Sequence, residues 1–256
     1  MSNIIILCKK ELKSLFVSPV AYCVITAFLF ICTLFFFHFL SSYNVAINKL
    51  FNSNGFSFEA ISVNTWVFEK YCTSIVSVFV FIIPLLTMRM FADERRQGTF
   101  EMLLTSPVSV FQIVMGKFLA TSLIVLMMTL IIFILPMVLC FEMNPEIKPL
   151  LIGILGTFLV GVSFTSVAMM AACFSESQIV SGISGATLLL ALYLIFLPAP
   201  SVGSSFEPIL RYISPGSHAN EFAQGVLSLQ SGIYFACLTI LGLFVTKRFL
   251  DTERWR

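Results

Sequence analysis

Six long apolar runs divide the chain, and polar segments of unequal length separate them. Each run contains about twenty residues, the number that an α-helix needs to cross the roughly 30 Å hydrocarbon core of a bilayer. The pattern predicts an all-α membrane protein with six transmembrane helices in a single domain over residues 1–256. The predicted spans are residues 20–40, 72–90, 118–141, 150–174, 179–198 and 229–246.

Proline and small residues add detail to these spans. Pro84 and Pro136 lie inside the second and third runs, where each is expected to kink its helix. Small residues recur in the fourth and fifth runs and favour close helix packing. Residues 41–70 are expected to form an outer loop. Residues 199–228 contain a turn at 214–216, and the spacing of Phe222, Val226 and Leu229 predicts a weakly amphipathic helix after it.

The residues before the first span have a helical pattern of their own. Apolar positions recur at helical spacing and lysines occupy the other side, so we expect an amphipathic helix over 1–18 in the membrane interface. A frayed N-terminus is the alternative. The apolar positions are Ile5, Cys8, Leu12, Leu15 and Phe16, and the basic ones are Lys9, Lys10 and Lys13.

Composition and charge support a membrane protein and predict its orientation. Hydrophobic residues make up 58% of the chain and charged residues 11%, against about 25% charged residues in soluble domains. With six spans, eleven of the 15 basic residues fall on the side of the two termini, which predicts that both termini are cytoplasmic in the cell inner membrane. These eleven are Lys9, Lys10, Lys13, Arg89, Arg95, Arg96, Lys117, Lys247, Arg248, Arg254 and Arg256.

Several classes of function lack the residues that they need. No Asp, Glu, Lys or Arg lies in the middle of a predicted span, which argues against an ion-coupled carrier and a charge-lined channel. The chain has no G-x-S-x-G or P-loop motif, and its seven cysteines are dispersed. We expect no catalytic residue, cofactor or metal site and no nucleic-acid partner. Any ATP that drives this protein is expected to be hydrolysed by another polypeptide.

The polar segment between the second and third spans predicts a docking surface. Residues 90–97 should continue the second span as a helix, with Gly98 as its C-terminal stop. Thr99 can cap a short helix over 100–104, and Ser106-Pro107 is expected to begin the third long helix. Apolar residues ringed by charges are typical of an interaction surface. The alternative is a solvated loop whose apolar residues lie against the membrane.

The same segment carries a family resemblance. Residues 93–108, DERRQGTFEMLLTSPV, resemble the E-R-x-x-G-T-x-E-x-L-L-x-x-P-V segment of type-2 ATP-binding-cassette (ABC) permeases. The nearest branch contains the gliding-motility permease subunit and the nitrous-oxide-reductase maturation permease. The similarity extends to LFVSPVAY at 15–22, IVMGKFLA at 113–120 and SPGSHANEFAQGVL at 214–227. Phe100 stands where such segments commonly have Leu.

The resemblance implies a half-transporter that exports its substrate. Two permease subunits, identical or different, pair in the membrane, and each docks a cytoplasmic ABC ATPase on the short helix between spans two and three. The 1–18 helix corresponds to the family's elbow helix, and 199–228 to its outer re-entrant hairpin. A membrane scaffold that recruits a soluble partner through residues 90–107, without transport, is the alternative function. The implied coupling residues are Glu94, Arg95, Gly98, Thr99, Phe100, Glu101 and Leu104.

Overall fold

The computed structural model describes residues 2–52, 63–96, 98, 108–143, 147–175, 177–195 and 207–254. All regular secondary structure in these ranges is helical, as the apolar pattern predicts. A short π-helical stretch, Asn64–Phe68, precedes α3. The α-helices are α1 (Ser2–Val17), α2 (Pro19–Asn52), α3 (Glu69–Thr87), α4 (Arg89–Arg96), α6 (Val110–Ile132), α7 (Ile134–Met143), α8 (Ile147–Cys173), α9 (Gln178–Leu194), α10 (Glu207–Ile213), α11 (Pro215–Ala223) and α12 (Leu229–Arg254).

Each predicted span coincides with an apolar helix. Five helical stretches are long and apolar enough to cross a membrane, and they cover the first four predicted spans and the last one. The fifth predicted span coincides with α9, which has 17 residues, at the lower end of the range for a transmembrane helix. The predicted span continues to residue 198, and its last three residues lie outside the described residues.

The outer loop predicted over 41–70 is wrong at both ends, because the chain is helical up to Asn52 and again from Asn64 through the start of α3. Helix α2 continues without interruption to Asn52. No glycine or proline occurs between Pro19 and Gly55, so nothing in this stretch breaks the helix. The first span therefore extends well beyond the apolar run from which it was predicted.

The start of the third long helix also differs from the prediction. Ser109, not Ser106, caps α6: its Oγ accepts a hydrogen bond from the Gln112 amide, and the Gln112 side chain accepts one from the Ser109 amide. This reciprocal pair is a capping box, which satisfies two backbone donors at the helix N-terminus. As a result Lys117, predicted to belong to the polar segment, lies about two turns inside α6.

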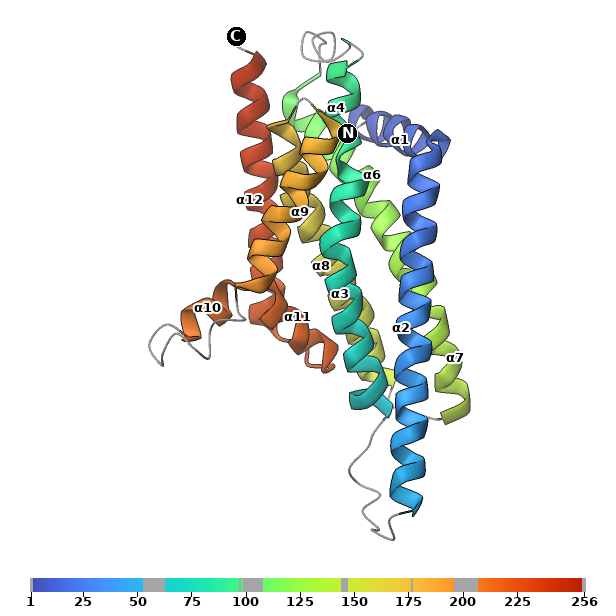
Figure 1. The fold of residues 1–256 in the computed structure, drawn as a ribbon. Coiled ribbons are helices and arrows are strands. Elements are labelled where there is room, and N and C mark those ends of the chain that lie inside the picture. Colours follow the sequence, from blue (N-terminus) through green and yellow to red (C-terminus); the bar gives the residue numbers. More distant parts are fainter. Residues whose placement is uncertain are drawn as a thin grey trace.

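Helix α8 occupies the centre of the bundle and packs on α3, α6, α9, α11 and α12 (Figure 1). Its small residues allow this close approach. A Cβ on Gly161 would lie 2.5 Å from Val125 Cγ1 of α6, and one on Gly242 of α12 would lie 2.8 Å from the Ser166 backbone. The predicted role of small residues in helix packing is therefore confirmed for α8.

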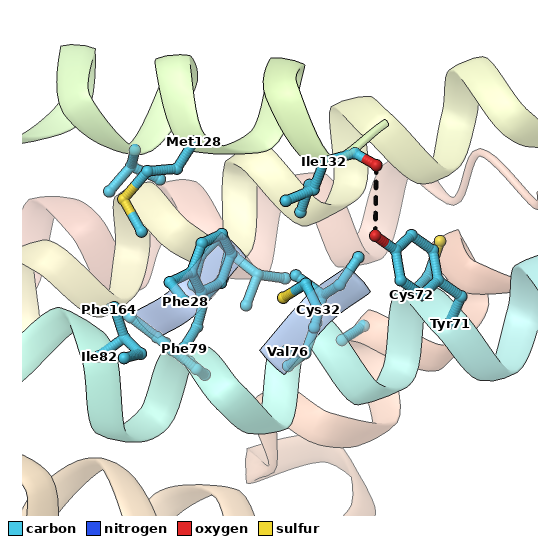
Figure 2. Packing of buried hydrophobic residues seen from close by; sticks show 14 of the residues in the cluster. Phe28, Cys32, Tyr71, Cys72, Val76, Phe79, Ile82, Met128, Ile132 and Phe164 are labelled. Atoms are coloured by element: carbon cyan, nitrogen blue, oxygen red, sulfur yellow. Dashed lines mark hydrogen bonds between the residues drawn. The ribbon is translucent and has the colours of Figure 1, made fainter. Parts of the chain in front are cut away.

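The main core lies between α2, α3, α6 and α8 (Figure 2). The rings of Phe28 and Phe79 stack with their centroids 5.1 Å apart. Tyr71 of α3 donates a hydrogen bond of 3.2 Å to the backbone carbonyl of Ile132, as the dashed line in Figure 2 shows. Pro136 follows four residues later and has no N–H to offer this carbonyl. Pro136 was predicted to kink the third span without ending it, and the structure instead divides the span into α6 and α7 at Phe133.

The helices that carry most of the charged residues lie together at one end of the bundle. Helices α1, α4 and the C-terminal part of α12 lie at one end, which we call the charged end (Figure 1). The pair of helices that the resemblance implies is present as α10 and α11. The turn predicted at 214–216 is wrong in part: Ser214 caps α11 by accepting a hydrogen bond from the Gly216 amide, so the helix already begins at Pro215, and it ends at Ala223, before Val226. The re-entrant position of this pair in a membrane stays a prediction.

Candidate functional site

Helix α4 leads from the second span into the polar segment that was predicted to dock a partner. Its apolar residues Met90, Phe91 and Ala92 are buried, and charged residues stand on both sides of them, at position 89 and at positions 93–96. Gly98 ends this helical stretch with φ = 68° and donates its amide to the Arg95 carbonyl at 3.1 Å. The left-handed conformation suits glycine because it has no Cβ. The predicted helix end at Gly98 is confirmed.

Lys117 joins three helices at the charged end. Its ammonium lies 2.9 Å from Glu94 Oε1 of α4, 3.1 Å from Glu11 Oε1 of α1 and 2.6 Å from the Met90 carbonyl. The Lys117 side chain is only 3% exposed. An ammonium has three N–H donors, and here each has an acceptor. Because two carboxylates and a carbonyl surround it, the buried charge of Lys117 is compensated within the fold.

Arg95 connects α4 to the other side of the charged end. Its Nη2 lies 2.8 Å from both carboxylate oxygens of Glu253 on α12 and donates to the Cys173 carbonyl at 3.0 Å. Cys173 is the last residue of α8, where carbonyls lack partners in their own helix. One guanidinium therefore closes the end of α8 and anchors α4 to α12.

Two further side chains of α4 complete its attachment. Arg89 pairs with Asp93 one turn away at 3.1 Å and donates to Ser18, which lies between α1 and α2. Asp93 also accepts a hydrogen bond from Gln178, the first residue of α9. Polar contacts thus join α4 to α6, α8, α9, α12 and the α1–α2 corner.

Helix α1 lies against α6 at the same end (Figure 1). Cys8 is buried there, and a Cβ on Gly116 of α6 would lie 2.7 Å from Leu7 Cβ. The residues Lys9, Lys10 and Lys13 are exposed, as the amphipathic pattern predicts. The predicted apolar side divides in two: Leu12 and Leu15 pack on the core, while Ile5 and Phe16 are exposed. The N-terminal residues form the helix α1, so the alternative of a frayed N-terminus is wrong.

The predicted coupling residues fall into two groups. Glu94 and Arg95 are largely buried in the ion pairs described above, so their side chains point into the bundle. Gly98 ends α4, whereas Thr99, Phe100, Glu101 and Leu104 lie outside the described residues. Docking by this segment stays a prediction. Glu11, Lys117 and Glu253 were not identified from the sequence, because each pairs with a residue far away in the chain.

A second polar cluster lies at α11, away from the charged end. His218 is 4% exposed, and its Nδ1 lies 2.8 Å from Ser231 Oγ, which donates to Glu221 at 2.5 Å. Its Nε2 lies 3.0 Å from the Tyr212 carbonyl and must carry a proton, since a carbonyl only accepts. In a catalytic triad the histidine lies between the serine and the acid. Here Ser231 lies between His218 and Glu221. This order suits a structural bridge between α11 and α12.

Comparison with known protein families identifies the family of this chain. A family model described as ABC-2 family transporter protein matches residues 5–246. The chain belongs to the ABC-2 transporter family. The match begins in α1 and ends in α12, so this ABC-2 protein is a multi-pass membrane protein of a family that works with an ATPase subunit. The branch within the family stays a prediction. No individual curated protein matches the chain.

Proposed function

We propose that this chain is the permease subunit of an ABC exporter in the cell inner membrane, with both termini in the cytoplasm. A separate ABC ATPase docks on residues 98–107, and its hydrolysis of ATP drives the substrate outward through a pair of permease subunits, identical or different. The chain itself carries no catalytic residue and binds no cofactor; the ATP belongs to the partner.

The observation that carries this proposal is the attachment of α4. This helix enters the predicted docking segment, and its charged side chains bind Lys117 of α6, Glu253 of α12 and Gln178 of α9. A rigid element tied to several spans transmits a displacement as a rigid-body movement. Force applied to residues 98–107 therefore reaches most of the bundle through α4.

The two groups of predicted coupling residues have different roles in this mechanism: one anchors α4 within the chain and the other contacts the ATPase. Glu94 and Arg95 anchor α4 inside the chain, because their partners Lys117 and Glu253 belong to the same bundle. Gly98 redirects the chain after α4. Contact with the ATPase falls to Thr99, Phe100, Glu101 and Leu104.

Site-specific photocrosslinking tests the docking step. A benzoylphenylalanine replaces Phe100 in the full chain, and a control variant carries it at Leu241, an exposed apolar position of α12. In native membranes, the variant at 100 should capture a polypeptide with a P-loop, identified by mass spectrometry, and the variant at 241 should not. Absence of such a product, or its equal capture at both positions, contradicts the proposal.

A second measurement separates a permease from a scaffold. The captured ATPase is purified with the chain in proteoliposomes, and its rate of ATP hydrolysis is compared with that of the ATPase alone. A coupled permease should change the rate, and Glu101→Lys should abolish both this change and the association. A scaffold predicts equal rates with and without the chain. Glu94→Lys is unsuitable here because it also breaks the ion pair with Lys117.

A further inference from the structure

A half-open cavity of ≈ 340 Å³ lies at the corner where α1, α2, α3, α4 and α6 meet. This volume falls within the range of about 300–1,000 Å³ that is typical of small-molecule sites. Its walls include six charged side chains, three of each sign: Lys10, Glu11, Arg89, Asp93, Glu94 and Lys117.

The charges are arranged in two layers of opposite net sign. Lys10, Arg89 and Asp93 form the outer layer, with side-chain exposures of 60%, 28% and 30%, and carry a net charge of +1. Lys117, Glu94 and Glu11 form the inner layer, with exposures of 3%, 14% and 13%, and carry a net charge of −1. Lys10 lies 3.9 Å from Glu94, a long contact that leaves its ammonium accessible from the mouth.

The remaining walls and the position of the corner indicate what meets this cavity. Leu85 of α3 and Val20 of α2 line it and are about two-fifths exposed. Ile5, Ile6 and Val17 of α1 are exposed next to the exposed lysines of the same helix. A helix that presents both apolar and basic residues outward lies at the level of the lipid headgroups. The cavity therefore opens where headgroups and acyl chains meet.

We infer that this corner binds the headgroup of a phosphatidylethanolamine. Its phosphate lies between Lys10 and Arg89, its ammonium points inward to Glu11 and Glu94, and its acyl chains leave along Val20 and Leu85. The headgroup is a zwitterion whose two charges match the two layers. A phosphatidylglycerol headgroup has no ammonium for the inner layer, and the trimethylammonium of phosphatidylcholine has no N–H to donate to the carboxylates.

Lipid retention by the purified full chain tests this inference. The detergent-solubilised protein is titrated with phosphatidylethanolamine, phosphatidylglycerol and phosphatidylcholine of the same acyl chains, and bound lipid is counted by native mass spectrometry. The wild type should retain one phosphatidylethanolamine at concentrations roughly tenfold lower than either other lipid, which corresponds to about 1.4 kcal/mol. Equal retention of the three lipids, or retention of none, overturns the assignment.

A matched pair of variants locates the site. Lys10→Gln removes a cation from the mouth of the cavity, and Lys9→Gln removes one from the neighbouring exposed position, which does not line it. Lys10→Gln should weaken retention of phosphatidylethanolamine about tenfold, and Lys9→Gln should leave it unchanged. Equal losses in both variants would show a diffuse attraction to the basic helix and refute the site. Neither outcome depends on the ATPase partner.

Discussion

Lys117 and Glu94 lie 2.9 Å apart, although the whole predicted docking segment separates them in the chain. Their ion pair joins α4, which precedes this segment, to α6, which follows it. Glu11 binds the same ammonium and so attaches α1 to the pair of helices α4 and α6. Under the proposed function, displacement of residues 98–107 by the ATPase is expected to move α4, α6 and α1 as one unit. This arrangement leads to the first prediction.

Removal of Lys117 should be strongly destabilising. Lys117→Met leaves two carboxylates, Glu94 and Glu11, without their buried counter-charge, which should cost about 3–5 kcal/mol. The measurement is thermal or denaturant unfolding of the purified chain in detergent. Glu94→Lys and Lys117→Glu should each destabilise as well, and their combination should recover part of the loss. A double variant as unstable as the sum of the two single ones would contradict the pairing.

Two glycines with open surroundings should respond in opposite directions to alanine. A Cβ on Gly98 or on Gly232 meets no atom within 4 Å, but only Gly98 has a positive φ, of 68°. Gly98→Ala should therefore destabilise the chain by about 1 kcal/mol through backbone strain. Gly232→Ala lies in α12 and should stabilise it by about as much. Unfolding in detergent measures both, and changes of the same sign would contradict the conformation at Gly98.

The thiol of Cys8 should report whether α1 is docked. Burial raises the pKa of this thiol, and the negative charge of Glu11 adds to the effect. Because the thiolate is the reactive form, labelling by maleimide at pH 7–8 should be slow in the wild type. Gly116→Val forces a side chain into Leu7 and should accelerate labelling at Cys8, read by peptide mass spectrometry. Gly232→Ala serves as the control, and equal rates in both variants would disprove the close contact.

The bridge at His218 should matter more than an ordinary serine hydrogen bond. Ser231→Ala leaves His218 Nδ1 and Glu221 Oε2 without their common partner and should cost about 1–3 kcal/mol. Ser74 donates to the Lys70 carbonyl of its own helix and is half-buried, so Ser74→Ala should change stability by less than about 0.5 kcal/mol. Similar losses in the two variants would argue against the bridge.

Local patterns in the sequence predict much of this fold. The lengths of the apolar runs locate six helices, and glycine chemistry places the end of the α4 stretch at Gly98. Charge pairing across the bundle is harder to predict. Lys117 lies at the end of a polar segment, so the sequence pattern assigns it to that segment. Glu11 lies between lysines, so its helix is predicted to be basic. Only the packing of α1, α4 and α6 brings these residues together, because their contacts join positions remote in the chain.

The carbonyl of Ile132 has a consequence for how the third span bends. Its acceptor site is filled by the Tyr71 hydroxyl of another helix, since Pro136 has no N–H to contribute. Tilting α7 away from the axis of α6 therefore breaks no backbone hydrogen bond at this carbonyl. A change in the angle between α6 and α7 is therefore least costly at this point of the third span, where the hydroxyl of another helix replaces a backbone donor.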